Sequence, residues 1–395
     1  MFSAGVQETV QEEGIVGYMK RVFISALLFM QSLSIAIAAD TLSCRILQEN
    51  NWAFYGTDNP VVKVSLANTR KIAGKYDIKC EVRDFLGNSL YDISQTGSVA
   101  PQDSSLLSFS FKALQPGFYN VVLYDSGRYL NRINLAKEPE KSSDALAQHL
   151  AQKGATGDFV YLANTVALER RDIRPQYSIF RSKELSGREK NVYNFSMVSR
   201  GDEKVTGYMA FPKGKKDLPL IITLVPMEER AANPLADFTA PASSAEMVIY
   251  LKQRGNESEN VKNLLTDMLL CIDYAFMREE IDPKAVYVQG KGYAAACAMV
   301  ASALEGRVAG SFMESPDVEL LTGAYSIESI ADHIEAPLLL GTGLQRDVYD
   351  LQEIFSIYNK VSAPKEYFVI PDSNIIPRDR WKYIRDVFIL RTREE

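Results

Sequence analysis

The stretch from Ile281 to Ala295 decides the fold, and it reads Ile-Asp-Pro-Lys-Ala-Val-Tyr-Val-Gln-Gly-Lys-Gly-Tyr-Ala-Ala. Residues 285–290 form an apolar run that predicts a strand, and the alanine-rich stretch 293–304 predicts a helix directly after it. Small residues at Gly290, Gly292 and Ala294 permit a tight turn and close packing of a helix on a strand. The stretch therefore predicts a strand that turns sharply into a helix, with Gly292 at the apex.

Strands and helices alternate on both sides of this turn, over residues 190–395. We expect strands at 191–199, 205–212, 218–225, 245–251, 308–315, 336–343 and 365–371, and helices at 259–277, 350–361 and 377–391. The later strands are almost continuously apolar, as strands covered on both faces must be. This alternation predicts an α/β domain with a doubly wound, mostly parallel sheet.

Residues 40–137 follow a different pattern, in which apolar and polar residues alternate in short segments separated by turns. Examples are 60–68, 75–84, 104–112 and 117–127. A period of two at hairpin spacing predicts roughly six to eight strands, and so an all-β, immunoglobulin-like sandwich. Residues 138–189 are expected to be a linker and helical connector, with one helix in the stretch 142–154.

Residues 1–39 have the features of an export signal. The basic group Met19-Lys20-Arg21 precedes the apolar run 22–39, which contains the small-x-small sequence Ala36-Ile37-Ala38. This order predicts a cleaved signal peptide that starts at Met19, and hence a periplasmic or secreted protein. A transmembrane anchor is the alternative, but the run is near the lower length limit for spanning and no basic flank follows it. We expect no stable membrane span after cleavage.

Composition sets further limits. The 395 residues carry 44 basic and 50 acidic side chains, a net charge of −6, and the basic residues are scattered, which disfavours nucleic acid as a partner. An exported protein can form disulfides, so Cys44 and Cys80 of the sandwich are candidates for a pair, whereas Cys271 and Cys297 are expected to be buried. With two histidines and no ligand spacing, we expect no metal and no cofactor.

The stretch 281–295 resembles the acetyl xylan esterase and cephalosporin-C deacetylase group of α/β hydrolases, where the turn reads close to D-x-x-x-I-Y-V-T-G-x-S-Q-G-G. Leu218-Pro219 and the apolar strand after it are similar to the L-P-a-i-v-x-x-H-G-y of that group. Gly343-Leu344, Phe355, Tyr358-Asn359 and 363–366 are similar to its G-L-x-D…F…Y-N…A-P-K-E. The resemblance covers 190–395 and implies an α/β-hydrolase domain. The N-terminal β-domain likewise resembles the accessory sandwich of some exported members.

The shared register places other residue types at the positions where the family has functional groups. Gly292 stands at the nucleophilic serine, Arg346 at the aspartate with Asp347 next to it, Ile375 or, with a one-residue slip, Asn374 at the histidine, and Val225-Pro226 at the oxyanion-site H-G. Glycine has no side chain to attack a carbonyl, and proline has no N–H to donate. The resemblance therefore implies an esterase fold in which the catalytic triad has been replaced.

Several residues near this relict site are candidates for binding. We expect Lys291, Tyr293, Val225, Pro226, Asp347 and Ser373 to line the old pocket, where cations and hydroxyls suit a sugar or an anion. Of the two interpretations, we favour the one in which these side chains fill space and make surface ion pairs. His333 lies on the N-terminal side of a strand, whereas hydrolase sites gather at strand C-termini, and His149 lies in a surface helix. We expect both histidines to be structural.

Three functions are compatible with these residues. We favour a non-catalytic relative of the exported acetyl xylan esterases that binds carbohydrate, such as an acetylated polysaccharide, or a protein partner through the pocket or the sandwich. The second is an active carbohydrate acetyl esterase whose catalytic residues have been relocated. The third is an assembly role through the edge of the sandwich.

Overall fold

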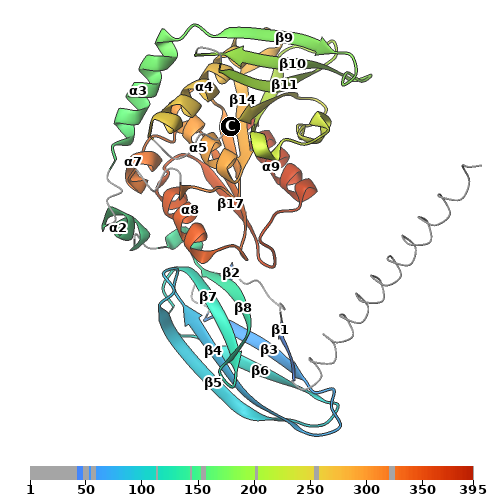
Figure 1. The fold of residues 1–395 in the computed structure, drawn as a ribbon, viewed down its shortest axis with the longest axis vertical. Coiled ribbons are helices and arrows are strands. Elements are labelled where there is room, and N and C mark those ends of the chain that lie inside the picture. The colour runs from blue at the N-terminus through green and yellow to red at the C-terminus, as the bar shows by residue number, and fades with distance from the viewer. Residues whose placement is uncertain are drawn as a thin grey trace, which may run out of the picture.

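The computed structural model describes residues 42–47, 53–54, 59–112, 114–142, 145–152, 157–200, 203–252, 258–319 and 325–394. Figure 1 shows two bodies placed end to end, a β-domain in blue and cyan and a larger domain of sheet and helices in green to red. The expected signal peptide at 1–39 lies outside the described residues, so it stays a prediction. Within the described ranges, no helix has the length and apolar character needed to cross a membrane.

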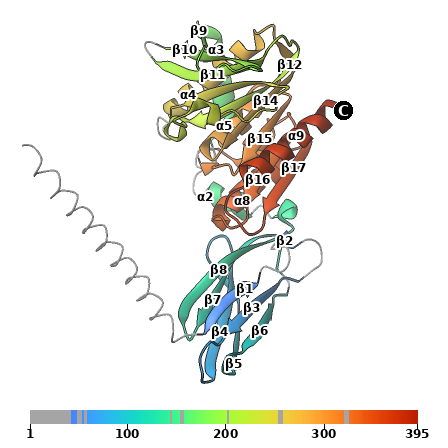
Figure 2. The same ribbon diagram turned by 90° about the vertical axis from the view of Figure 1, so that its right-hand side faces the viewer.

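The N-terminal body consists of two sheets (Figure 2). One has the order β1-β3-β6, and the other has the order β2-β8-β7-β4-β5. Their strands are β1 (Ser43–Leu47), β2 (Ala53–Phe54), β3 (Val61–Ala67), β4 (Gly74–Arg83), β5 (Ser89–Val99), β6 (Ser104–Ser110), β7 (Gly117–Asp125) and β8 (Arg128–Lys137). In β3, buried Val62, Val64 and Leu66 alternate with more exposed residues, and they share a core with Leu123 of the other sheet. The immunoglobulin-like character of this domain stays a prediction.

All four cysteines have free thiols in the structure. Cys44 lies on β1 and Cys80 on β4, in different sheets, and no disulfide joins them. The sequence allowed this pair, because both residues lie in the same domain. Burial raises the pKa of the Cys44 thiol to about 11 and that of Cys80 to about 12. Both sulfurs therefore behave as small apolar groups of the sandwich core.

We expect four thiols per chain to react with a thiol reagent in denaturant without reductant. In the native protein at pH 8, Cys80 should be protected from alkylation, since the thiolate is the reactive form and burial disfavours it. The measurement is a thiol titration of native and denatured protein. A count of two in denaturant would show instead that Cys44 and Cys80 are paired.

The larger domain is built on a nine-stranded sheet with the order β17-β16-β15-β14-β12-β13-β11-β10-β9. Its strands are β9 (Gln176–Ser182), β10 (Lys190–Val198), β11 (Lys204–Pro212), β12 (Leu218–Pro226), β13 (Ala245–Leu251), β14 (Ile281–Lys291), β15 (Gly310–Glu314), β16 (Leu338–Gly343) and β17 (Lys365–Ile370). The strands from β17 to β13 in this order are parallel, and β11, β10 and β9 are antiparallel. The predicted α/β class with a mostly parallel sheet agrees with this arrangement.

The sheet extends into residues 138–189, which the sequence assigns to a linker and helical connector. That segment contains a 3-10 turn (Pro139–Lys141), α2 (Ala145–Gln152), α3 (Phe159–Asp172) and then β9, which pairs with β10. The sequence did not indicate β9, because this edge strand is nowhere fully buried and lacks a clear apolar alternation. The sheet therefore begins before residue 190.

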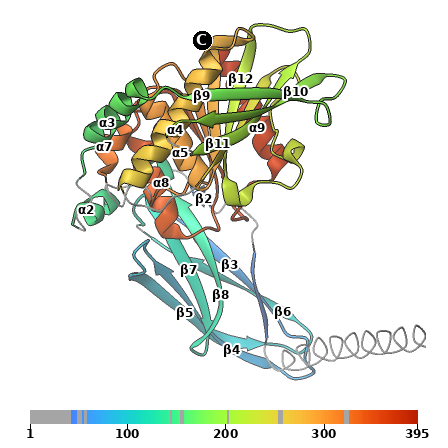
Figure 3. The ribbon, with the colours of Figure 1, turned by 45° about the horizontal axis from the view of Figure 1, so that its top comes forward.

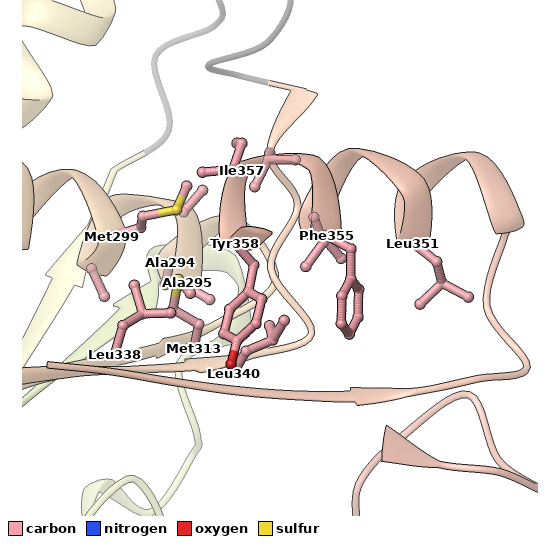
Figure 4. Close-up of a cluster of buried hydrophobic side chains, with 14 of the residues drawn as sticks. Ala294, Ala295, Met299, Met313, Leu338, Leu340, Leu351, Phe355, Ile357 and Tyr358 are labelled. Atoms are coloured by element: carbon pink, nitrogen blue, oxygen red, sulfur yellow. The ribbon is translucent and has the colours of Figure 1, made fainter. Parts of the chain in front are cut away.

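Helices cover the two faces of the parallel half (Figure 3). They are α4 (Ser258–Phe276), α5 (Tyr293–Leu304), α7 (Ile327–Ala331), α8 (Val348–Lys360) and α9 (Arg378–Glu394). On one face, Ala294 and Ala295 of α5 and Phe355 of α8 pack over Met313 and other strand residues (Figure 4). On the other face, Trp381 and Phe388 of α9 pack on β14, β15 and β16. The alanines let α5 lie close to the sheet directly after the sharp turn.

Candidate functional site

The turn between β14 and α5 has the backbone of a nucleophile elbow. Gly292 has φ 56° and ψ −125°, a conformation that residues with a side chain rarely adopt. Its N–H donates to the Glu314 carbonyl at 3.0 Å, and its own carbonyl accepts from the Ala295 N–H and the Asp317 N–H, each at 3.0 Å. A Cβ at Gly292 would meet no atom within 4 Å. The apex is therefore strained and open, but it presents no reactive group.

The loop after β16, which contains Arg346 and Asp347, is held by the sandwich. The Asn134 side chain on β8 donates to the carbonyls of Leu344, at 2.8 Å, and Arg346. Asp347 accepts from the Tyr349 N–H at 2.8 Å and so caps α8. Arg346 forms a 3.6 Å ion pair with Asp350. The side chains of Arg346 and Asp347 therefore both have structural partners at the start of α8.

The loop after β17, which contains Asn374 and Ile375, carries no imidazole. Asn374 is exposed, and Ile375 is 55% exposed. The Ser373 hydroxyl accepts from the Ile375 N–H at 3.1 Å, and its carbonyl accepts from the Gln345 N–H at 2.9 Å. These bonds fix the loop against the neighbouring one, and Ser373 is engaged in them.

A cleft of about 290 Å³ opens beside the elbow, at the C-terminal ends of β12, β14 and β15. Its remaining wall is formed by α9 and by the loop that holds two 3-10 turns, Met227–Glu229 and Pro234–Ala236. Of the residues expected at the pocket, the cleft is lined by Lys291, Val225 and Pro226, whereas Tyr293, Asp347 and Ser373 lie outside the lining. The sequence did not indicate the lining residues Thr223, Thr239, Gln289, Arg378 and Trp381.

A buried polar network forms the floor of the cleft. The Gln289 amide donates to the hydroxyls of Thr223, at 2.7 Å, and Thr239, at 2.6 Å. Both hydroxyls donate in turn to a carboxylate oxygen of Glu246, at 3.0 and 3.2 Å. From α9, Arg385 donates to the Gln289 side-chain oxygen at 3.0 Å and to the Thr239 hydroxyl at 2.9 Å. The floor is thus held in one arrangement by bonds that reach α9.

Two carboxyl groups of the cleft, Glu246 in the floor and the partly buried Glu314 at the rim, have raised pKa values. Burial raises the pKa of Glu246, which is fully buried, against the opposing effect of backbone N–H bonds and of Arg385. Burial also raises the pKa of Glu314, which is opposed by the Lys291 ammonium 3.2 Å away. A charged residue in the apolar strand 245–251 was the signal that could have indicated Glu246. Arg385 gave no such signal, because several arginines stand in its helix.

The two histidines lie against aromatic rings. The ring centroid of His149 on α2 is 6.5 Å from that of Tyr349. Nδ1 of His333 is 2.8 Å from the Ser329 carbonyl oxygen, and its ring centroid is 5.5 Å from that of Phe159. His333 precedes β16, so it lies toward the edge of the sheet opposite the elbow. No group of three His, Cys, Asp or Glu suited to a metal occurs among the described residues.

Comparison with known proteins yields structural relatives only. No family model matches the sequence, and no curated protein matches it. The acetyl xylan esterase from Paenibacillus sp. R4 superposes with a TM-score of 0.52 at 16% identity, over 58% of this chain and 93% of that one. Acetyl xylan esterase 1 from Thermoanaerobacterium sp. JW/SL YS485 gives 0.52 at 15% identity, over 60% and 95%. The larger domain has the α/β-hydrolase fold. At this identity the likeness shows the fold alone.

The strained apex predicts a cost for any side chain at Gly292. We expect Gly292→Ala to lower the free energy of unfolding by about 1–3 kcal/mol, because the space is open and only the backbone conformation opposes the methyl group. Gly306→Ala is the matched control, since its Cβ also meets nothing within 4 Å and its φ is not positive. Denaturant unfolding measures both, and equal stabilities would contradict the strain.

The buried network predicts a large effect of Arg385→Met. We expect a loss of about 3–5 kcal/mol, because the change leaves the buried Gln289 side-chain oxygen and the Thr239 carbonyl without a donor and removes the 2.7 Å ion pair with Asp386. Arg391→Met, which breaks the exposed 2.7 Å pair with Glu366, should cost about 0–1 kcal/mol. Unfolding in urea compares the two variants.

The same variant should change the pH dependence of stability. Since the pKa of Glu246 is raised, the folded chain keeps a proton that the unfolded chain has lost, and stability falls as pH rises above 4.5. The charge of Arg385 holds the pKa of Glu246 down, so its removal should raise that pKa further. The pH range over which stability falls should then be wider. We expect the deficit of Arg385→Met to be greater at pH 7 than at pH 4.5, and a constant deficit would contradict the coupling.

Proposed function

We propose that this chain is a non-catalytic α/β-hydrolase-fold protein that binds carbohydrate in the cleft beside the elbow. The observation that carries the proposal is Gly292, which retains the elbow backbone and lacks a nucleophile. Loss of the serine or the histidine of a triad costs about a millionfold in turnover, or roughly 8 kcal/mol of barrier. The relict acid and base positions here carry Arg346 and Ile375 or Asn374, so no neighbouring group compensates.

The cleft retains features that suit a sugar. Its floor presents the fixed hydroxyls of Thr223 and Thr239, and Trp381 supplies an aromatic wall. Lys291 and Glu314 provide a cation and an acid at the rim. A few placed polar groups in a partly apolar hollow are typical of small-ligand sites. Two of the structural relatives are acetyl xylan esterases, which supports an acetylated polysaccharide as the ligand class.

The proposal also covers the export of the chain and its division into domains. We propose cleavage of residues 1–39 with Met19 as the start, and export to the periplasm or the medium. We further propose an immunoglobulin-like domain at 40–137, a connector at 138–189 that includes β9, and a hydrolase-fold domain at 190–395. A protein partner at the sandwich is a further candidate ligand of the exported chain.

Catalysis is tested with an acetylated xylo-oligosaccharide and with a nitrophenyl acetate. We expect acetate release by the purified protein to equal that of Gly292→Ala and of buffer. Gly292→Ser should also stay inactive, because no imidazole stands at the base position to activate the hydroxyl. Hydrolysis by the wild type that a single change in the cleft abolishes would overturn the proposal.

Binding is tested by calorimetry with the same acetylated oligosaccharide. We expect Lys291→Ala, which breaks a 3.2 Å pair with Glu314 at the rim, to weaken binding about fivefold or more. The matched control is Lys79→Ala on the sandwich, which breaks a 3.1 Å pair with Asp92 and should leave affinity unchanged. Equal affinities of both variants and the wild type would place the ligand outside the cleft.

An active acetyl esterase with relocated residues remains the alternative. It requires His149 or His333 as the base, since the sequence has two histidines. This alternative predicts that His149→Ala or His333→Ala abolishes ester hydrolysis at unchanged stability. Their aromatic and backbone contacts predict a change in stability instead.

A further inference from the structure

A second hollow, also of about 290 Å³, lies on the antiparallel part of the large sheet. Paired residues on neighbouring strands point to the same face, and the pairing of Thr206 with Tyr250 places the hollow on the face that α9 covers. Helix α9 packs on β14, β15 and β16, so it does not extend over β9 and β10. The hollow is therefore separate from the elbow cleft.

The hollow has a polar and aromatic lining arranged in two rows across the strands. Phe180, Asn194 and Tyr208 form one row, and Ser178, Ser196, Thr206 and Tyr250 form the other. Phe180 is 69% exposed, an unusual position for a large apolar ring on a sheet. Hydroxyl and amide groups beside open aromatic faces suit the hydroxyls and the C–H faces of sugar rings.

Arg230 is held over this lining by aromatic rings. Its guanidinium carbon lies 4.9 Å from the ring centroid of Tyr250 and 5.9 Å from that of Tyr208. Nη2 donates to the Tyr208 hydroxyl at 3.1 Å, and the Tyr250 hydroxyl donates to Asp237 at 2.7 Å. Arg230 is exposed, and its bond to Tyr208 uses one of the five N–H donors of the guanidinium. It is therefore positioned to meet an anion in the hollow.

The positive charge of the lining favours an anionic ligand. Arg230 and Lys204 both line the hollow, and no carboxylate lies among its described lining residues, although the chain as a whole has a net charge of −6. A guanidinium binds a carboxylate through two parallel bonds. We propose that this hollow binds an acidic saccharide, with Arg230 on the uronate carboxylate and the Phe180 ring against the sugar. The residues that line this hollow are all different from those that line the elbow cleft.

Calorimetry on the full chain tests the site with a uronic-acid oligosaccharide and its carboxyl-reduced, neutral counterpart. We expect the acidic form to bind at least about tenfold more tightly, and Arg230→Gln to remove that difference. Phe180→Ser should weaken both forms, because the ring contact does not depend on charge. Arg391→Gln, which removes an exposed arginine of α9, is the matched control and should bind as the wild type.

Other outcomes would overturn the proposal. Equal affinity for the acidic and neutral forms, or an unchanged affinity in a folded Arg230→Gln variant, excludes the carboxylate contact. Loss of acidic-saccharide binding in Lys291→Ala, with Arg230→Gln unaffected, assigns that ligand to the elbow cleft. Inorganic phosphate that binds as tightly as the uronate, or dimerisation that Phe180→Ser abolishes without any saccharide binding, identifies a different occupant. Failure of the cleft proposal leaves these results unchanged.

Discussion

The conformation of Gly292 is the constraint on which the larger domain depends. Its positive φ reverses the chain between β14 and α5, and its backbone groups bond to the ends of β15 and α5. Gly290, two residues earlier, leaves room for the α5 backbone, since a Cβ there would collide with Ala294. These contacts put α5 against the sheet and place the loops after β12, β15 and β16 around one edge. The turn thus has a structural purpose that does not require a nucleophile.

The sequence predicted the parallel half of the sheet well, because its strands are buried on both faces and read as apolar runs. The helix expected at 293–304 has those bounds in the structure, since alanines mark its buried face. The edge strand β9 was missed because it is paired on one side and has no fully buried residue. Burial dictates composition, so elements at the edge of a sheet give a weaker signal.

The candidate site was predicted less completely. The alignment with the esterase motifs identified Gly292, Val225 and Pro226, because these residues belong to the regular pattern of strands and turns. The floor of the cleft joins Thr223, Gln289 and Glu246 on three strands to Arg385, far along the chain, and this convergence is a property of the folded sheet. The loop 227–244 contributes Thr239 without any periodic pattern. Sequence therefore indicated where the cleft would open, and the structure was needed to identify what lines it.

The contact of Asn134 with the loop after β16 has a consequence for how this site can vary. Asn134 binds the main-chain carbonyls of Leu344 and Arg346, and Gln345 exchanges bonds with the Asn134 backbone. Hydrogen bonds to main-chain atoms can form whatever side chains stand at positions 344 and 346. Substitutions at position 346 can therefore occur while the Asn134 contacts between the two domains are kept. The interface fixes the backbone of the loop but does not depend on the side chains at positions 344 and 346.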